Sequence, residues 1–158
     1  MKEYYVVLDS YNGIQVNDDV SNIQWNLSRP IPKAAIISLH QFNFNCTTNS
    51  GFSNENSDGF LLQLFNVGNF NSSFVSLNNK PMAQTVILGC VPNSSVLNQD
   101  FTEKIIGSYE PINPLQIRNS NISELHTIQI RICDDSLNNL SLDSTLDWSV
   151  ILRINQQE

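Results

Sequence analysis

The chain has 158 residues, with 8 basic and 15 acidic side chains, a net charge of −7 and only 15% charged residues. Its polarity comes mainly from 22 Asn and 19 Ser, which compete with helical backbone for hydrogen bonds and so argue against a helical bundle. The basic residues are spread singly along the sequence, so we expect no binding to nucleic acid or to an anionic membrane surface. No run reaches the roughly 20 apolar residues of a membrane helix, and no signal-peptide core is present, so we expect no membrane insertion and a cytoplasmic, non-secreted protein.

In the first half of the chain, apolar residues form either continuous or alternating runs. Continuous runs cover Tyr4–Leu8, Phe60–Val67 and Gln84–Val91, and such runs are typical of strands covered on both faces. Alternating runs cover residues 23–27 and Ser38–Cys46, and a period of two predicts strands buried on one face only.

The second half repeats the alternating pattern in its two clearest segments. Leu125–Cys133 and Leu146–Ile154 each place apolar residues at every second position, which predicts half-buried strands. Weaker strand candidates are Phe74–Leu77, Lys104–Tyr109 and Leu115–Arg118, and short helical turns are expected within Asp100–Ile106 and Ser136–Leu142.

These elements predict an all-β protein. About eight short strands separated by turn-forming pairs such as Asn12-Gly13 and Asp58-Gly59 fit a sandwich or barrel. The length favours a single eight-stranded jelly-roll sandwich, with two antiparallel sheets and Greek-key connections, formed by residues 1–158 as one domain. Trp25 and Trp148 lie on apolar faces and are expected in the core.

The search for catalytic or metal-binding patterns gives little. His40 and His126 share the parity of apolar neighbours, so they could meet as a metal pair, but strand-end or core positions are the commoner outcome. No three-ligand metal motif or nucleophile motif occurs, so we expect no enzyme, metal or cofactor. Cys46, Cys90 and Cys133 are far apart in apolar segments and are predicted to be buried thiols.

Two acidic pairs allow a second interpretation. Asp18-Asp19 and Asp134-Asp135 could contribute oxygen ligands to a calcium ion. Acidic turns between strands are the more common role of such pairs, and we favour that interpretation.

Two regions together point to a family. The first comprises Y-V-V-L-D-S-Y-N-G at residues 5–13, S-N-I-Q-W-N-L-S-R-P-I-P at residues 21–32 and A-I-I-S-L-H-Q-F-N-F at residues 35–44. The second comprises L-H-T-I-Q-I-R-I-C-D-D at residues 125–135 and L-D-W-S-V-I-L-R-I at residues 146–154. Over about half the chain this resembles the single jelly-roll minor capsid proteins, particularly the penton proteins, of large eukaryotic DNA viruses, virophages and polinton-like viruses.

The resemblance implies a structural virion protein. It would form a homopentamer at the five-fold vertices of an icosahedral capsid, in contact with the major capsid protein and other minor capsid proteins. The alternatives are another minor capsid or cement protein between or beneath capsomers, or a ligand- or receptor-binding jelly-roll domain. Residues 1–3 could form an arm that reaches a neighbour. The candidate subunit contacts lie in polar loops: Asn49, Asn54, Asp58, Asn93, Asp100, Glu110, Asn113, Asp134, Asp135 and Asp143.

Overall fold

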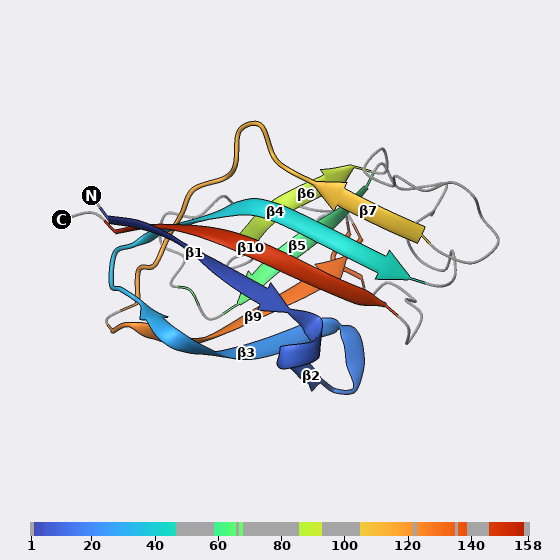
Figure 1. Ribbon diagram of the computed structural model, residues 1–158, viewed down its shortest axis with the longest axis horizontal. Helices are drawn as coiled ribbons and strands as arrows, with labels where there is room; N and C mark the ends of the chain where they lie inside the picture. The colour runs from blue at the N-terminus through green and yellow to red at the C-terminus, as the bar shows by residue number, and fades with distance from the viewer. Residues whose placement is uncertain are drawn as a thin grey trace.

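The computed structural model describes residues 2–46, 59–65, 67, 86–92, 105–121, 123–134, 136–138 and 146–156. This part of the chain is all-β, with two antiparallel five-stranded sheets packed face to face (Figure 1). The elements are β1 (Lys2–Asp9), the 3₁₀ turn η1 (Ser10–Asn12), β2 (Ile14–Val16), β3 (Asp19–Ile31), β4 (Ile36–Cys46), β5 (Gly59–Phe65), β6 (Val86–Pro92), β7 (Ile105–Tyr109), β8 (Ile117–Arg118), β9 (Leu125–Cys133) and β10 (Asp147–Gln156).

The two sheets are wound from nested pairs of strands. The first sheet, sheet A, has the order β1-β10-β4-β7, with the short β8 also paired to β4. The second, sheet B, has the order β2-β3-β9-β5-β6. Apart from β2 and β8, the first strand pairs with the last, β3 pairs with β9, β4 with β7 and β5 with β6. Segments far apart in sequence therefore lie side by side.

Aromatic side chains fill the centre of the sandwich. Both tryptophans are buried, as predicted, and their rings meet edge to face with centroids 5.5 Å apart. Each indole N–H reaches a backbone carbonyl across the sheets: Trp25 donates to Asp9 at 2.7 Å and Trp148 donates to Val20 at 2.8 Å. A buried indole needs such a partner, so these two bonds tie β3 and β10 to their neighbours without leaving a polar atom unpaired.

The predicted alternation is confirmed over most of the four half-buried strands and fails at His40 and His126. Ile128, Ile130 and Ile132 are buried on β9, and every second residue from Trp148 to Ile154 is buried on β10. The apolar run of β5 is buried on both faces, because Phe60, Leu62 and Leu64 pack in the main core and Leu61 packs with Ile87 and Cys133 in a second apolar cluster.

Three expectations need correction. Tyr4–Leu8 forms a strand, but it is covered on one face only: Tyr4, Val6 and Leu8 pack against the core, whereas Tyr5 and Val7 are exposed. Lys2 and Glu3 are paired to β10, so these two residues belong to the sheet rather than to an arm. The described residues also form ten strands instead of eight, because β2 and β8 add short edge pairings.

Local turn chemistry explains the additional hairpin of β2 and β3. Asn17 and Asp18 both have φ of 56°, and Val16 pairs with Asp19 around them. Two consecutive left-handed residues define a type I′ turn, in which Asn and Asp are favoured. The sequence therefore held the signal for this hairpin, although β2 is only three residues long.

Several expected elements cannot be compared with the structure. The strand candidate Phe74–Leu77 lies outside the described residues. Of the two expected helical turns, Ile105 and Ile106 begin β7 and Ser136 lies in a hydrogen-bonded turn, and the remaining residues lie largely outside the described part of the chain.

Candidate interaction surfaces

Three of the ten candidate contact residues fall in the described part of the chain. Glu110 and Asn113 are exposed in the segment between β7 and β8, and Asp134 is half-buried after β9. The other seven candidates lie outside the described residues: Asn49, Asn54, Asp58, Asn93, Asp100, Asp135 and Asp143. The structure thus brings Glu110 and Asn113 into one loop and places Asp134 on the other sheet.

The described members of the acidic pairs organise turns. Oδ1 of Asp19 accepts hydrogen bonds from the backbone N–H of Ser21 at 2.9 Å and from its hydroxyl at 2.6 Å. Oδ1 of Asp134 accepts from the backbone N–H groups of Ser136 and Asn138 at 2.9 and 2.7 Å. Such bonds fix the chain in Asx-type turns. Within the described residues, no group of three or more His, Cys, Asp or Glu side chains is placed to bind a metal ion.

The two histidines do not form a pair. His40 lies on β4 of sheet A, where its ring contacts Tyr5 with centroids 4.9 Å apart, whereas His126 lies on β9 of sheet B beside Glu124 at 3.9 Å. Both are exposed although their parity matches buried neighbours. The reason is an irregularity in the strand pairing beside each residue. His40 is the unpaired residue of a bulge between Leu39 and Gln41, and a bulge reverses which face the following residues occupy. His126 lies where the pairing of β9 with β3 shifts between Asn26 and Ile31.

The cysteines differ in accessibility. Cys133 is fully buried on the outer side of sheet B with Leu61 and Ile87, under the partly buried Leu137, and this burial raises the pKa of its thiol. Cys90 is exposed, which corrects the expectation that it is buried. The side chain of Cys46 is not among those described.

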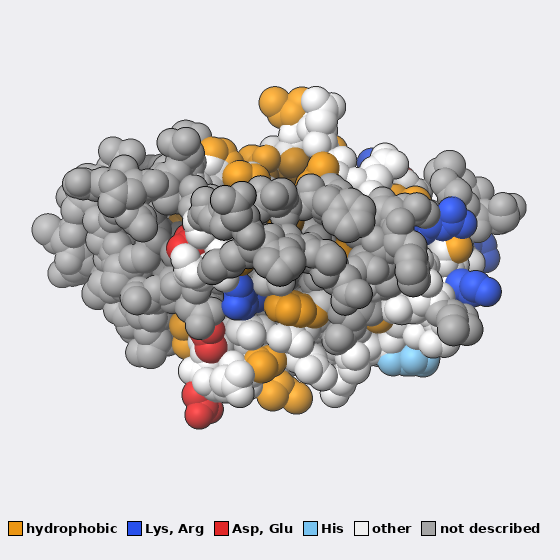
Figure 2. Space-filling view, turned by 180° about the vertical axis from the view of Figure 1, so that it is seen from behind, with side chains coloured by type: hydrophobic (Ala, Val, Ile, Leu, Met, Phe, Trp, Pro, Cys, Tyr) orange, Lys and Arg blue, Asp and Glu red, His pale blue; other side chains and the backbone are white. Residues whose placement is uncertain are grey.

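Basic side chains gather at one end of the sandwich although they are dispersed in the sequence, and Glu3 and Glu124 lie at the same end. Five of the six described Lys and Arg residues lie toward the end that holds both chain termini and the turn between β3 and β4 (Figure 1): Lys2, Arg29, Lys33, Arg118 and Arg153. The opposite end carries Asp9, Asp18, Asp19, Asp134 and Asp147. On the face seen in Figure 2, most blue side chains lie toward the right margin, and the red ones lie toward the left with one blue side chain among them. The basic end is thus a product of strand pairing.

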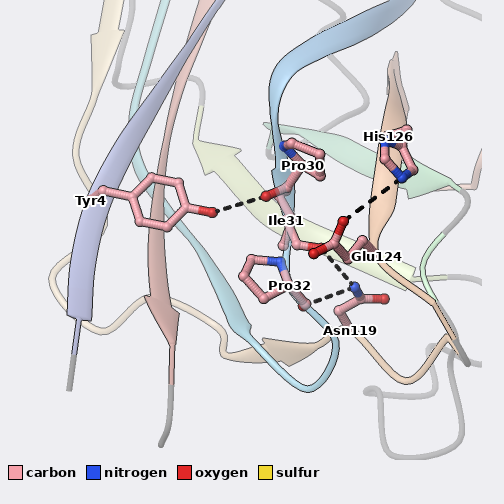
Figure 3. A network of polar contacts seen from close by, with 7 residues as sticks. All are labelled: Tyr4, Pro30, Ile31, Pro32, Asn119, Glu124 and His126. Atoms are coloured by element: carbon pink, nitrogen blue, oxygen red, sulfur yellow. Dashed lines mark hydrogen bonds and ion pairs between the residues drawn. The ribbon is translucent and has the colours of Figure 1, made fainter.

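A buried asparagine that the sequence did not single out supports the basic end (Figure 3). Asn119 is fully buried, and its amide donates to the carbonyl oxygens of Ile31 and Pro32 at 3.4 and 3.1 Å. Its own backbone carbonyl accepts from the N–H of Ala34, which has φ of 62°. These bonds hold the turn from β3 to β4 in place. Because Asn119 is one of 22 asparagines in the chain, nothing in the sequence distinguishes it as the residue with this role.

Exposed apolar side chains lie along two opposite edges of the sandwich. The first group, the β1 edge, consists of Tyr5, Val7, Tyr11 and Ile14. The second group, the β7 edge, consists of Ile106, Ile112 and Leu115. In sheet A, β1 and β7 are the two ends of the strand order, and apolar side chains appear at the upper and lower margins of the view in Figure 2. Val7 is 66% exposed, Tyr11 80% and Ile112 94%.

The outer face of sheet A between these edges is polar. Gln41, Asn43 and Ser108 form a hydrogen-bonded trio, with distances of 2.9 to 3.2 Å. A hollow of about 270 Å³ beside it includes the carboxylates of Asp9 and Asp147. Oδ1 of Asp147 accepts a hydrogen bond from the Ser10 hydroxyl at 2.7 Å. These groups can form hydrogen bonds across an interface. They do not combine a nucleophile with an adjacent base, as a catalytic site would require.

Comparison with protein-family models and with curated proteins identifies no relative. No protein-family model matches the chain, and no curated protein matches it. The described part of the chain contains no helix long and apolar enough to cross a membrane.

Proposed function

We propose that this protein is a single jelly-roll capsid subunit, which assembles head to tail into a homopentameric ring at the vertices of an icosahedral virion. The nested strand pairs support the jelly-roll assignment. Pairing first with last, and so on inward, is what rolling up one long antiparallel hairpin would produce, and in this proposal the eight strands so paired form the two Greek keys of a jelly roll. In this proposal β2 and β8 are additions to that plan.

The observation that carries the proposal is the presence of two different apolar edges on one sandwich. Isolated exposed apolar residues are ordinary, but groups of them mark interaction surfaces. A symmetric dimer needs one self-complementary patch, whereas a head-to-tail ring needs two different patches that fit each other. The β1 edge and the β7 edge supply two different patches, because they lie at opposite ends of sheet A, and their fit to each other is part of the proposal.

The number of subunits and the location in the virion come from the resemblance of the N- and C-terminal regions to penton proteins. Contacts with the major capsid protein and other minor capsid proteins are part of the same proposal. The exposed Glu110 and Asn113 flank Ile112, so they would form a polar rim around the apolar contact of the β7 edge, as is usual at interfaces.

Light scattering on three variants tests the head-to-tail contact. Val7→Asp and Ile112→Asp each place a charge on one edge, and Ser123→Asp adds the same charge at an exposed residue outside both edges. We expect the wild type and Ser123→Asp to form rings at near-millimolar concentration, and each edge variant to be monomeric. A mixture of the two edge variants should give a dimer only, because each retains one intact edge.

Three results would contradict the proposed ring. Edge variants with the mass of the wild type would show that these edges are not the interface. Sensitivity of one edge alone would indicate a symmetric dimer. A wild type that stays monomeric throughout would favour the alternative role of a cement protein, which binds between or beneath capsomers without its own ring.

A further inference from the structure

A groove runs between β1, an edge strand of sheet A, and the part of β3 in sheet B that lies beyond its pairing with β2. It has a volume of about 330 Å³ and is lined by residues 4–9 of β1, Asn12, and residues 25–29 of β3. This volume is at the lower end of those of ligand sites in proteins. The groove is elongated along β1, so an extended chain fits its course better than a compact small molecule does.

The walls of the groove offer backbone hydrogen-bonding groups. In the described part of the chain, β1 pairs with β10 on one side only, so every second residue directs its N–H and C=O away from the sheet. On β3, Asn26 and Ile31 pair with β9, but residues 27–30 between them do not. These four residues therefore lie outside the regular pattern of backbone hydrogen bonds between the two strands. The Tyr4 hydroxyl spans the two walls to the carbonyl of Pro30, but at 3.5 Å (Figure 3), a long distance for such a bond.

The side chains of the groove define its polarity. Tyr4, Val6 and Leu27 are half-buried and give it an apolar floor. At the basic end, the guanidinium of Arg29 lies 3.8 Å from the centroid of the Tyr4 ring, and no carboxylate among the described residues forms an ion pair with it. At the other end, the carboxylate of Asp9 already accepts the N–H of Tyr11 at 2.9 Å. The groove therefore holds an oriented cation at one end only.

We propose that this groove binds an extended segment of a partner protein, which adds to β1 as an antiparallel strand and places a carboxylate on Arg29. Antiparallel addition puts the C-terminal part of the segment beside Lys2 and Arg29, so the carboxylate is an acidic side chain near that end or a free C-terminus. Backbone bonds to the edge strand supply affinity, and alternate apolar side chains on the floor supply specificity. This inference does not depend on the proposed ring, but Tyr5 and Val7 belong both to the groove and to the β1 edge, so a neighbour in the ring would cover the groove. Every protein in the peptide test therefore also carries Ile112→Asp, which blocks the ring at the β7 edge and leaves the groove unchanged.

Fluorescence anisotropy with two synthetic peptides tests the proposal. Both are labelled eight-residue peptides of alternating threonine and valine with an amidated C-terminus; one ends in aspartate, the other in asparagine. The proposal predicts that the first peptide binds the Ile112→Asp protein about tenfold or more tightly than the second, the effect of one charge-assisted hydrogen bond. Arg29→Glu should reverse this preference. Arg118→Glu, the same charge change at an exposed residue of β8, should leave it unchanged.

Two further measurements distinguish binding in the groove from a general effect of charge or a loss of folding. Ser28→Trp fills the groove from an exposed position without a change of charge, and it should abolish binding of the aspartate peptide. Amide hydrogen exchange should show new protection within residues 4–9 on binding, while β7 is unaffected. Circular dichroism of each variant verifies that it is folded.

The proposal is wrong if the aspartate peptide fails to bind the Ile112→Asp protein at about 1 mM, the concentration range of the weakest specific complexes. It is also wrong if Arg29→Glu and Arg118→Glu weaken binding equally, or if the protected amides lie outside β1. Failure of the peptide test leaves the ring test unaffected, since that test measures the mass of the protein without peptide.

Discussion

β1 and β5 look alike in the sequence and differ in the structure. Both are continuous apolar runs, Tyr4–Leu8 and Phe60–Val67, and both were expected to be covered on two faces. β5 lies inside sheet B, and Phe60, Leu61, Leu62 and Leu64 are buried. β1 is an edge strand, and it exposes alternate residues to solvent. An apolar run in a strand thus indicates either a strand covered on both faces or an exposed apolar surface. What packs on the outer face of the sheet decides which: Leu61 of β5 is covered by a second apolar cluster with Ile87 and Cys133, and the outer face of β1 has no such cover among the described residues.

The largest effect separating the two strands is expected for Leu62→Ala. Leu62 is fully buried, so truncation removes core contacts and leaves a cavity, which should lower the free energy of unfolding by about 2–5 kcal/mol. Urea denaturation followed by tryptophan fluorescence measures it. A loss below about 1 kcal/mol would mean that β5 is not part of the packed core.

The inner side of the other edge strand, β7, should behave like β5. Gly107 pairs with Phe44, and a Cβ at residue 107 would lie 1.9 Å from Cζ of that ring. Gly107→Ala therefore forces the buried ring to move, with an expected loss of about 1–3 kcal/mol. Adding Phe44→Leu makes room, so the loss in the double variant should be smaller than the sum of the single losses. Strict additivity would show that the two residues do not meet.

Val7→Ala should leave stability almost unchanged. Because Val7 is mostly exposed on the outer side of β1, its truncation should shift the free energy of unfolding by no more than about 0.5 kcal/mol. The urea titration is made at a dilution where light scattering finds monomers. A loss as large as that of Leu62→Ala would mean that the outer face of β1 is covered within the same chain.

The smallest effect concerns the ion pair that joins the edge strand to its neighbour. A hydrogen bond at 2.6 Å from Arg153 on β10 lowers the pKa of Glu3 from its ordinary value of 4.5. The pair is solvent-exposed, so its contribution is small. A lowered folded-state pKa means that this contribution is complete above the unfolded pKa and is lost as the pH falls through the folded one.

Thermal unfolding of Glu3→Gln checks the sign of this effect. The variant should unfold slightly below the wild type at pH 6, and the difference should vanish as the pH falls well below 4.5. Glu110→Gln, which replaces an exposed carboxyl that forms no ion pair among the described residues, serves as the control. A difference that grows at low pH would contradict the assigned direction of the pKa shift.

Much of the fold was predictable because the pattern of burial in a strand is local. The alternation in β9 and β10, the buried tryptophans and the turn roles of Asp19 and Asp134 all follow from residues within a few positions of each other. The candidate surfaces were less predictable. Of the predicted contacts, Glu110 and Asn113 fall beside an apolar edge, but the apolar side chains themselves were not recognised as contacts.

The errors arose where pairing between distant segments decides the outcome. His40 was expected on the buried face and is exposed, because it has no partner on β10 at the bulge. The parity of His126 failed because β3 shifts its register between Asn26 and Ile31. Neither β10 nor β3 is near its histidine in sequence, so no local pattern could report these shifts.

By itself, the sequence determined that this protein is built of strands, which residues of each strand are apolar, and where the turns fall. These properties depend on the backbone preferences and hydrophobicity of neighbouring residues. Only the tertiary structure decided that β1 and β7 are edges, that basic residues from five segments gather at one end, and that a groove opens between β1 and β3. Such features depend on which strands become neighbours, and in a nested sandwich those neighbours lie up to the whole length of the chain apart.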